Sequence, residues 1–134
     1  MTLIDSNILI DILGGDPHWS ESSRAWLADR KRQGPIAIND VIYAELSAGF
    51  ARREQLDREI EAIGLTIARL SKDALFLAGQ VYRRYRAAGG TPANVLADFF
   101  IGAQASAEGW PILTRDAKRY RTYFPEVALV GIEG

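Results

Sequence analysis

Short apolar segments alternate with longer amphipathic segments along the chain, and this alternation limits the folds open to it. The short segments are predicted to be strands and cover residues 2–4, 36–38, 65–67, 111–113 and 127–130. Buried parallel strands are typically continuous apolar runs, and the helices between them cover the two faces of the sheet. We therefore expect an α/β fold in which a parallel sheet carries helices on both faces.

Apolar residues at helical spacing occupy the intervals between these strands. The predicted helices cover residues 7–13, 20–33, about 39–50, a segment from about residue 53, residues 72–87, and a segment opened by Thr91 and Pro92. Glycine and proline mark helix ends, as at Gly34-Pro35 and Gly89-Gly90. With 134 residues and no repeat or linker, the chain is expected to form a single domain over residues 1–134.

The composition excludes several kinds of chemistry. Cysteine is absent and His18 is the only histidine, so neither a Cys/His zinc site nor a thiol nucleophile is available. The first five residues lack the basic start of a secretory signal, and no uncharged apolar run reaches the ~20 residues of a membrane span. We expect a cytoplasmic protein without a membrane segment, because a chain without cysteine fits the reducing cytosol.

Two candidate site residues lie where parallel sheets bind ligands, beyond the carboxyl ends of the strands. Asp5 follows the first predicted strand directly, and Asp116 follows the fourth after Thr114. Each carboxylate, taken alone, could equally be the N-cap of the helix that follows it. Their functional interpretation therefore depends on which other residues reach the same edge of the sheet.

Two further carboxylates lie on predicted helices in apolar surroundings. Glu45 is on the apolar side of its helix, where glutamate is rare without a partner, so it is either a site residue or half of a salt bridge with an arginine. Asp98 is the only charged residue between Arg86 and Glu108, on a helix that is apolar nearly all round. It is aligned with small residues such as Gly102, so another group can approach closely. The alternative is tight helix packing with Asp98 bonded to a backbone donor.

If these four carboxylates meet at one edge of the sheet, their mutual repulsion needs relief. Two like charges about 4 Å apart repel by about 4 kcal/mol in partly buried surroundings. Relief comes from raised pKa values or from a bound cation, and with oxygen ligands alone the natural cation is Mg²⁺ or Mn²⁺. Metal-assisted hydrolysis of a phosphodiester is the reaction class that follows.

Four segments of the chain together resemble the PIN-domain nucleases. The segments are residues 3–11, Glu45-Leu46, residues 97–105 and residues 113–120, and their order and spacing match over essentially the whole chain. The short form is similar to the VapC-like toxins of bacterial toxin–antitoxin pairs. The resemblance implies a three-layer α/β/α sandwich with a central, mainly parallel β-sheet and an acidic pocket at the strand ends. It also implies Mg²⁺- or Mn²⁺-dependent endoribonuclease activity, in which water attacks phosphorus.

The resemblance also implies roles for individual residues. The family's acidic metal-binding quartet is matched by the predicted catalytic residues Asp5, Glu45, Asp98 and Asp116. Asn7 and Thr114 match its supporting polar positions, whereas Asn39 stands where many members carry Ser or Thr. Members typically form homodimers and are silenced by an antitoxin whose tail enters the acidic pocket. A toxin of this kind is expected to reach operator DNA only through its antitoxin.

An RNA substrate has to be held by positive groups. The net charge is −1, but 13 of the 16 basic residues are arginine, which binds phosphate through two parallel hydrogen bonds. The candidate RNA phosphate contacts beside Asp116 are Arg115, Lys118, Arg119 and Arg121. A second basic group consists of Arg83, Arg84 and Arg86. Either group could instead be an ordinary solvated face.

Two other functions compete with RNA cleavage. The first is a non-catalytic PIN-like module that binds RNA or protein, and the repulsion within a complete acidic set argues against it. The second is phosphotransfer with Asp5 as nucleophile, which would call for a second aspartate at the position of Asn7. We therefore interpret the chain as a ribonuclease toxin that inhibits translation or growth.

Overall fold

The computed structural model describes residues 1–91 and 96–131, apart from the side chain of Arg119. The strands are β1 (Thr2–Ile4), β2 (Ile36–Ile38), β3 (Leu65–Ile67), β4 (Ile112–Leu113) and β5 (Leu129–Val130). They form one sheet in the order β3-β2-β1-β4-β5, and every pairing in it is parallel. The first strand therefore lies at the centre of the sheet, between β2 and β4.

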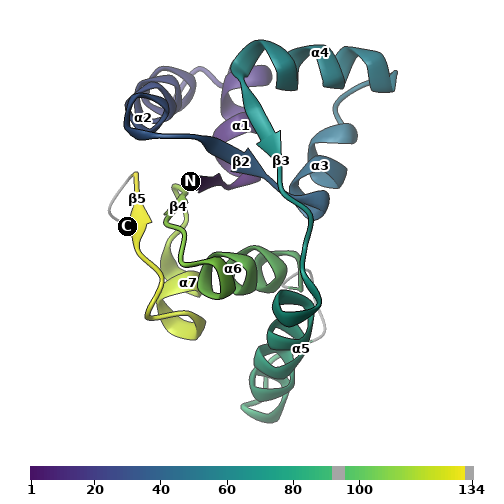
Figure 1. Cartoon of the computed structure of the whole chain (residues 1–134), viewed down its shortest axis with the longest axis vertical. Coiled ribbons are helices and arrows are strands. Elements are labelled where there is room, and N and C mark those ends of the chain that lie inside the picture. Colours follow the sequence, from purple (N-terminus) through teal and green to yellow (C-terminus); the bar gives the residue numbers. More distant parts are fainter. Residues whose placement is uncertain (92–95, 132–134) are drawn as a thin grey trace.

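Helices cover both faces of this sheet. They are α1 (Ser6–Leu13), α2 (Ser20–Gln33), α3 (Asp40–Ser47), α4 (Arg53–Ile63), α5 (Lys72–Ala87), α6 (Leu96–Glu108) and α7 (Lys118–Tyr123). Figure 1 shows α1, α2 and α4 on one side of the sheet and α6 and α7 on the other, with α5 packed on α6 and extending away. This arrangement confirms the predicted α/β/α sandwich with a parallel central sheet. Within the described ranges, none of the helices has the length and apolar character needed to cross a membrane.

The helix boundaries follow from capping residues next to the strands. Asp5, directly after β1, accepts a hydrogen bond from the amide of Ser6 at 2.8 Å and is the N-cap of α1. Asn39, directly after β2, caps α3 by accepting a hydrogen bond from the amide of Ile42 at 2.9 Å. Gly64 ends α4 with a φ of +87°, a left-handed conformation that glycine adopts without steric cost.

The predicted helices differ from the structure at the end of α3 and at α7, and one predicted helix start cannot be compared with the structure. α3 ends at Ser47 rather than near residue 50, because the chain turns there and the amide of Phe50 bonds to the carbonyl oxygen of Ser47. α7 was not predicted, since its six residues are too few to display a helical period. The predicted helix start at Thr91 and Pro92 falls mainly on residues 92–95, which lie outside the described residues.

Aromatic side chains hold α6 against α5 and α7. The buried ring of Phe99 lies 5.3 to 6.3 Å, centre to centre, from the rings of Tyr82, Tyr85, Tyr123 and Phe124. Gly102, about one turn further along α6, lies so close to the Phe124 ring that a Cβ atom would overlap it. The close approach predicted from the small residues of this helix is therefore made by Phe124.

A buried amide pair ties α6 to the ends of two strands. The Nδ2 atom of Asn39, after β2, donates to Oε1 of Gln104 on α6 at 2.8 Å. The Nε2 atom of Gln104 donates to the carbonyl oxygens of Ala68 and Arg69, after β3, at 3.1 and 3.3 Å. These bonds hold α6, which also carries Asp98, at the carboxyl edge of the sheet.

The strand order of the sheet reverses between β1 and β4. The chain passes from β1 to β2 and β3 on one side of the sheet, and only later to β4 and β5 on the other. In open parallel sheets, ligands bind at this reversal, outside the carboxyl ends of the strands. Here the amide of Asp5 donates to the carbonyl oxygen of Leu113 at 2.9 Å, so the residues that follow β1 and β4 are neighbours.

Candidate active site

Asp5 is the one buried residue among the four predicted acids. It lies at the carboxyl end of β1 and is 5% exposed. Three groups donate hydrogen bonds to its carboxylate, namely the amide of Ser6 at 2.8 Å, the hydroxyl of Thr114 at 2.9 Å and the hydroxyl of Tyr120 at 3.0 Å. All three donors are neutral, so none of them balances the negative charge of an ionised Asp5.

Burial is the main reason why the pKa of Asp5 is raised from 3.8 to about 6. The charge of Asp98 raises this pKa further, whereas the hydrogen bonds from Thr114, Tyr120 and Ser6 oppose the rise. A buried carboxylate under these conditions ionises more readily when a cation is near. A cation bound beside Asp5 would therefore lower this pKa.

Asp98 and Glu45 interact electrostatically with each other from two different helices. Asp98, on α6, is half-buried, and its charge raises the pKa of both Asp5 and Glu45. Partial burial is the larger cause of the raised pKa of Glu45, and a hydrogen bond with the Ser6 side chain opposes it. Asp5, Asp98 and Glu45 are hereafter called the coupled acidic set, because the charge of Asp98 acts on the other two.

The expectation that Glu45 lies on a buried helix face was wrong. Glu45 remains exposed at the surface and is only partly desolvated by its neighbours, because Ile42 and Leu46 form the buried face of α3 and Glu45 lies beside it. Among the described side chains, Glu45 forms no ion pair with an arginine, the alternative considered above, and the Ser6 side chain is the polar group that lowers its pKa. The short, mostly apolar helix α3 made Glu45 look more enclosed than it is.

Tyr120 is a site residue that the sequence interpretation did not single out. It is 1% exposed, and its hydroxyl donates to Oδ2 of Asp5. Burial, together with the charges of Asp5, Asp98 and Glu45, raises the pKa of Tyr120 well above its usual value, so it remains a neutral donor. Its place in the segment 113–120 was the one available signal, and that segment does not reveal which way the side chain points.

Thr114 and Asn7, the predicted supporting residues, connect the ends of β1 and β4. The buried hydroxyl of Thr114 donates to Asp5 and accepts hydrogen bonds from the amide of Asp116 at 3.0 Å and from Nδ2 of Asn7 at 3.3 Å. The Oδ1 atom of Asn7 accepts a hydrogen bond from the amide of Arg115 at 3.4 Å. Both residues therefore touch other predicted site residues.

Asp116 lies next to this network, but its carboxyl group is exposed. It lines a hollow of about 340 Å³ together with Lys118, Thr122 and Tyr123. The N-cap of α7 is Ala117, and among the described contacts no capping hydrogen bond comes from the Asp116 side chain. Its amide reaches the network through Thr114, whereas its charge is not among the main causes of the raised pKa of Asp5.

The chemistry of these donors fits a hard divalent cation. Carboxylate oxygens are the ligands that Mg²⁺ and Mn²⁺ prefer, and a cation would relieve the repulsion that Asp98 exerts on Asp5 and Glu45. Across residues 1–91 and 96–131, no three histidine or carboxylate side chains lie close enough together to enclose an ion by themselves. The structure therefore brings three of the four predicted acids into electrostatic contact and leaves Asp116 at the margin.

The four basic residues predicted to contact RNA lie in different surroundings. The guanidinium group of Arg115 donates two hydrogen bonds to Asp11 on α1, at 2.8 and 3.1 Å, so it has a protein partner. Lys118 and Arg121 are exposed on α7, and Lys118 lines the 340 Å³ hollow. The side chain of Arg119 lies outside the described part of the chain. The second basic group is exposed near the end of α5 and consists of Arg83, Arg84 and Arg86.

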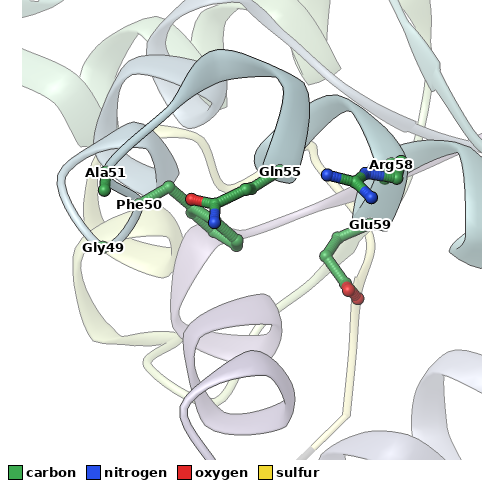
Figure 2. Close-up of a pocket in the computed structure, with 6 residues that line it drawn as sticks. All are labelled: Gly49, Phe50, Ala51, Gln55, Arg58 and Glu59. Carbon is green, nitrogen blue, oxygen red and sulfur yellow. The ribbon is translucent and has the colours of Figure 1, made fainter.

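Phe50 lines three hollows beside α1, α3 and α4, and one of them reaches Glu45. Three adjoining hollows of about 290 to 400 Å³ share Phe50, in the turn between α3 and α4. Figure 2 shows one of them, between this turn and the side chains of Gln55, Arg58 and Glu59 on α4. Another, between α1 and α3, is lined by Ile10 and Glu45, so this hollow borders the coupled acidic set.

Comparisons with known proteins agree with this architecture. The model of the PIN domain family matches residues 2–125. The chain is 29% identical over 114 residues to Ribonuclease VapC10 of Mycobacterium tuberculosis, which covers 85% of this chain and 81% of that protein. The fold is shared with VapBC2 of Rickettsia felis bound to a promoter DNA fragment, with a TM-score of 0.72, 23% identity and 98% of both chains covered. A toxin–antitoxin complex from Klebsiella pneumoniae gives a TM-score of 0.66, 25% identity and 96% of both chains covered.

Proposed function

The chain belongs to the PIN domain family, and on that basis we propose that it is a divalent-metal-dependent endoribonuclease, the toxin of a toxin–antitoxin pair. Its similarity to Ribonuclease VapC10 supports the activity, and its structural likeness to toxin–antitoxin complexes supports an antitoxin partner. We propose that residues 1–134 act as one nuclease domain in the cytoplasm. Hydrolysis of RNA phosphodiester bonds there would inhibit translation or growth.

The coupled acidic set carries this proposal. Asp5, Asp98 and Glu45 come from the end of β1, from α6 and from α3, and the charge of Asp98 acts on the other two. A module that only binds RNA gains nothing from a buried carboxylate near negatively charged phosphates. The same carboxylates become useful when a cation joins them to a phosphate.

We propose that Asp5 and Asp98 hold a Mg²⁺ or Mn²⁺ ion, with Glu45 joining directly or through water. Asp116 would orient the attacking water or help to hold a second ion. When bound, such an ion supplies Lewis acidity for the attack of water on phosphorus.

Hydrogen bonds orient the carboxylate of Asp5 for this task. Its Oδ2 atom accepts hydrogen bonds from both Thr114 and Tyr120, whereas its Oδ1 atom accepts one, from the amide of Ser6. A carboxylate oxygen has two lone pairs, so Oδ1 retains one for an ion while Oδ2 is engaged by the protein. This difference supports Oδ1 as the oxygen that would face the metal.

The RNA backbone is proposed to pass the hollow beside Asp116. Lys118 lines that hollow and Arg121 is exposed on the same helix, so we propose that these two residues contact phosphates. Arg115 is left out of this role because two hydrogen bonds hold its guanidinium group against the buried carboxylate of Asp11. Contacts of this kind release counterions, so RNA binding should weaken as salt increases.

The two protein partners are proposed to use different surfaces. We propose that the antitoxin occupies the hollow between α1 and α3, because Phe50 lines this hollow and Glu45 borders it. A segment bound there would cover an edge of the acidic set. Two copies of the chain are proposed to pair through α5, where Leu75 and Phe76 are 42% and 71% exposed.

Cleavage of total bacterial RNA by the purified chain, in Mg²⁺ or Mn²⁺ and in chelator, tests the activity. The substitution Asp98→Asn keeps the shape of the side chain and removes its charge. Cleavage should fall at least about 100-fold, since a loss of about 3 kcal/mol of transition-state stabilisation has that effect. The matched control is Asp73→Asn, at an exposed position in the first turn of α5, which should cleave like the wild type.

The outcomes separate the proposal from its rivals. Cleavage that survives both chelator and Asp98→Asn would overturn the assignment of the site. A folded wild-type chain that neither cuts RNA nor binds Mn²⁺ in a titration would favour a non-catalytic binding module. Metal-dependent cleavage that is lost in Asp98→Asn would establish the nuclease and one of its ligands together.

A further inference from the structure

An ion pair between Asp11 and Arg115 joins α1 to the loop between β4 and α7. The Nε atom of Arg115 donates to Oδ2 of Asp11 at 2.8 Å, and its Nη2 atom donates to Oδ1 at 3.1 Å. The Asp11 side chain is 2% exposed and that of Arg115 is 30% exposed, so the pair is partly withdrawn from water. A two-point contact between a planar guanidinium group and a carboxylate fixes direction as well as distance.

Contacts from two further segments converge on the same pair. The hydroxyl of Ser23, on α2, donates to Oδ2 of Asp11 at 2.9 Å. The guanidinium carbon of Arg115 lies 5.1 Å from the centre of the Trp19 ring, just before α2. The amide of Trp19 donates to Oδ1 of Asp16 at 2.8 Å, which holds this turn in place. Arg115 is thus anchored to α1 and to the turn before α2, and α2 in turn holds its partner Asp11.

Arg115 lies in the chain between two predicted site residues. On one side is Thr114, whose hydroxyl donates to Asp5. On the other side is Asp116, whose amide donates to that hydroxyl. A shift in the backbone of Arg115 would therefore move both neighbours relative to Asp5.

We propose that Arg115 is a positioning residue of the active site, whose ion pair with Asp11 and contact with Trp19 hold Thr114 and Asp116 beside Asp5. This inference rests on the proposed nuclease function. It assigns Arg115 a task different from phosphate binding, although the residue lies close to the exposed basic side chains of α7. Lysine cannot take over this task, because one ammonium group cannot reproduce the two-point contact.

The substitution Arg115→Lys tests the proposal with three measurements on the full chain. The first two are kcat and KM, measured on a fluorogenic single-stranded RNA that the wild type cuts, and the third is Mn²⁺ affinity in the absence of RNA. Residues that orient metal ligands typically change affinity or activity about 10- to 100-fold when replaced. We therefore expect Mn²⁺ affinity or kcat to fall by about that factor, with KM for RNA little changed. The matched control is Arg53→Lys, which alters an exposed arginine–aspartate pair with Asp57 and should change none of these quantities.

A second variant separates positioning from a general loss of folding. Arg115→Ala leaves room for a guanidinium ion, so guanidinium chloride well below denaturing concentrations should restore part of its Mn²⁺ affinity. The same salt should have no such effect on Arg53→Ala. Thermal unfolding of each variant shows whether the chain is folded during these measurements.

Amide hydrogen exchange separates failure of this proposal from failure of the nuclease function. The amides of Arg115 and Asp116 should exchange faster in Arg115→Lys than in the wild type, whether or not the chain cuts RNA. A wild type that neither cuts RNA nor binds Mn²⁺ would refute the nuclease function. An active wild type would overturn the positioning role if Arg115→Lys left Mn²⁺ affinity, kcat and exchange unchanged. A rise in KM alone would overturn it in favour of direct RNA contact.

Discussion

Tyr120 and Asp5 are 115 residues apart in the chain, yet the Tyr120 hydroxyl donates a 3.0 Å hydrogen bond to Oδ2 of Asp5 in the protein interior. This bond lowers the pKa of Asp5, while burial and the charge of Asp98 raise it to about 6. The groups that donate hydrogen bonds to Asp5 are neutral, whereas the residues that act on it electrostatically are acidic. The carboxylates are therefore held in place without being neutralised, as a cation site requires.

Replacing Tyr120 with phenylalanine removes this hydroxyl and keeps the aromatic ring. Without the bond, the pKa of Asp5 should rise further, so Mn²⁺ affinity should fall by up to about tenfold at pH 6.5 and by less at pH 8, where Asp5 is ionised in either protein. Mn²⁺ titrations at the two pH values measure the effect. Tyr123→Phe, three residues along the same helix, is the control and should behave like the wild type. A tenfold loss that is equal at both pH values would contradict this explanation.

The raised pKa of Asp5 predicts that the metal-free chain loses stability between about pH 4 and pH 6. The ordinary pKa is 3.8 and the folded value is about 6, so in this range the folded state keeps a proton that the unfolded state has released. The free energy of unfolding therefore falls as pH rises, by roughly 3 kcal/mol in all for this group.

Asp5→Asn isolates this effect. Urea unfolding in chelator should show the variant to be more stable than the wild type above pH 6, with the difference shrinking toward pH 4. Addition of Mn²⁺ at pH 7 should stabilise the wild type and leave the variant unchanged. The control Asp73→Asn, on the surface, should give no pH-dependent difference. If the Asp5→Asn difference did not vary with pH, burial of an ionised Asp5 would not be its cause.

The sequence predicted most elements of this fold because the strands are mainly apolar and the longer helices have a periodic stripe or a clear end signal, whereas α7, with six residues and no side-chain cap, was missed. Asp5 was placed at the site because it directly follows a predicted strand, whereas the supporting role of Thr114 was implied by the resemblance to the PIN-domain nucleases. Glu45 was misjudged because helix periodicity indicates which face a residue is on, not how far the neighbouring element extends over it. The roles of Tyr120 and Arg115 depend on contacts across more than 100 residues of chain, which no local pattern reveals.

Gly102 and Gly79 offer a paired test of how α6, the helix that carries Asp98, packs against Phe124. A methyl group at Gly102 would overlap the ring of Phe124, whereas nothing lies within 4 Å of one at Gly79. Gly102→Ala should therefore destabilise the chain by about 1–3 kcal/mol through overpacking. Gly79→Ala should stabilise it by up to about 1 kcal/mol, because alanine favours the helix. Urea unfolding measures both changes, and a stable Gly102→Ala variant would mean that Phe124 can move aside.

If RNA passes the hollow beside Asp116, Lys118 should contribute to the salt dependence of RNA binding. If Lys118 contacts one phosphate, Lys118→Ala should weaken RNA binding and reduce the slope of log Kobs against log salt by about 0.7, the value for one contact to a single strand. Binding is measured in the Asp98→Asn background, so that the RNA stays intact. The control is Lys72→Ala, an exposed lysine at the start of α5, which should leave the slope unchanged. If Lys118→Ala had the same slope as the control, the RNA backbone would have to follow another path, and the exposed arginines near the end of α5 would be tested next.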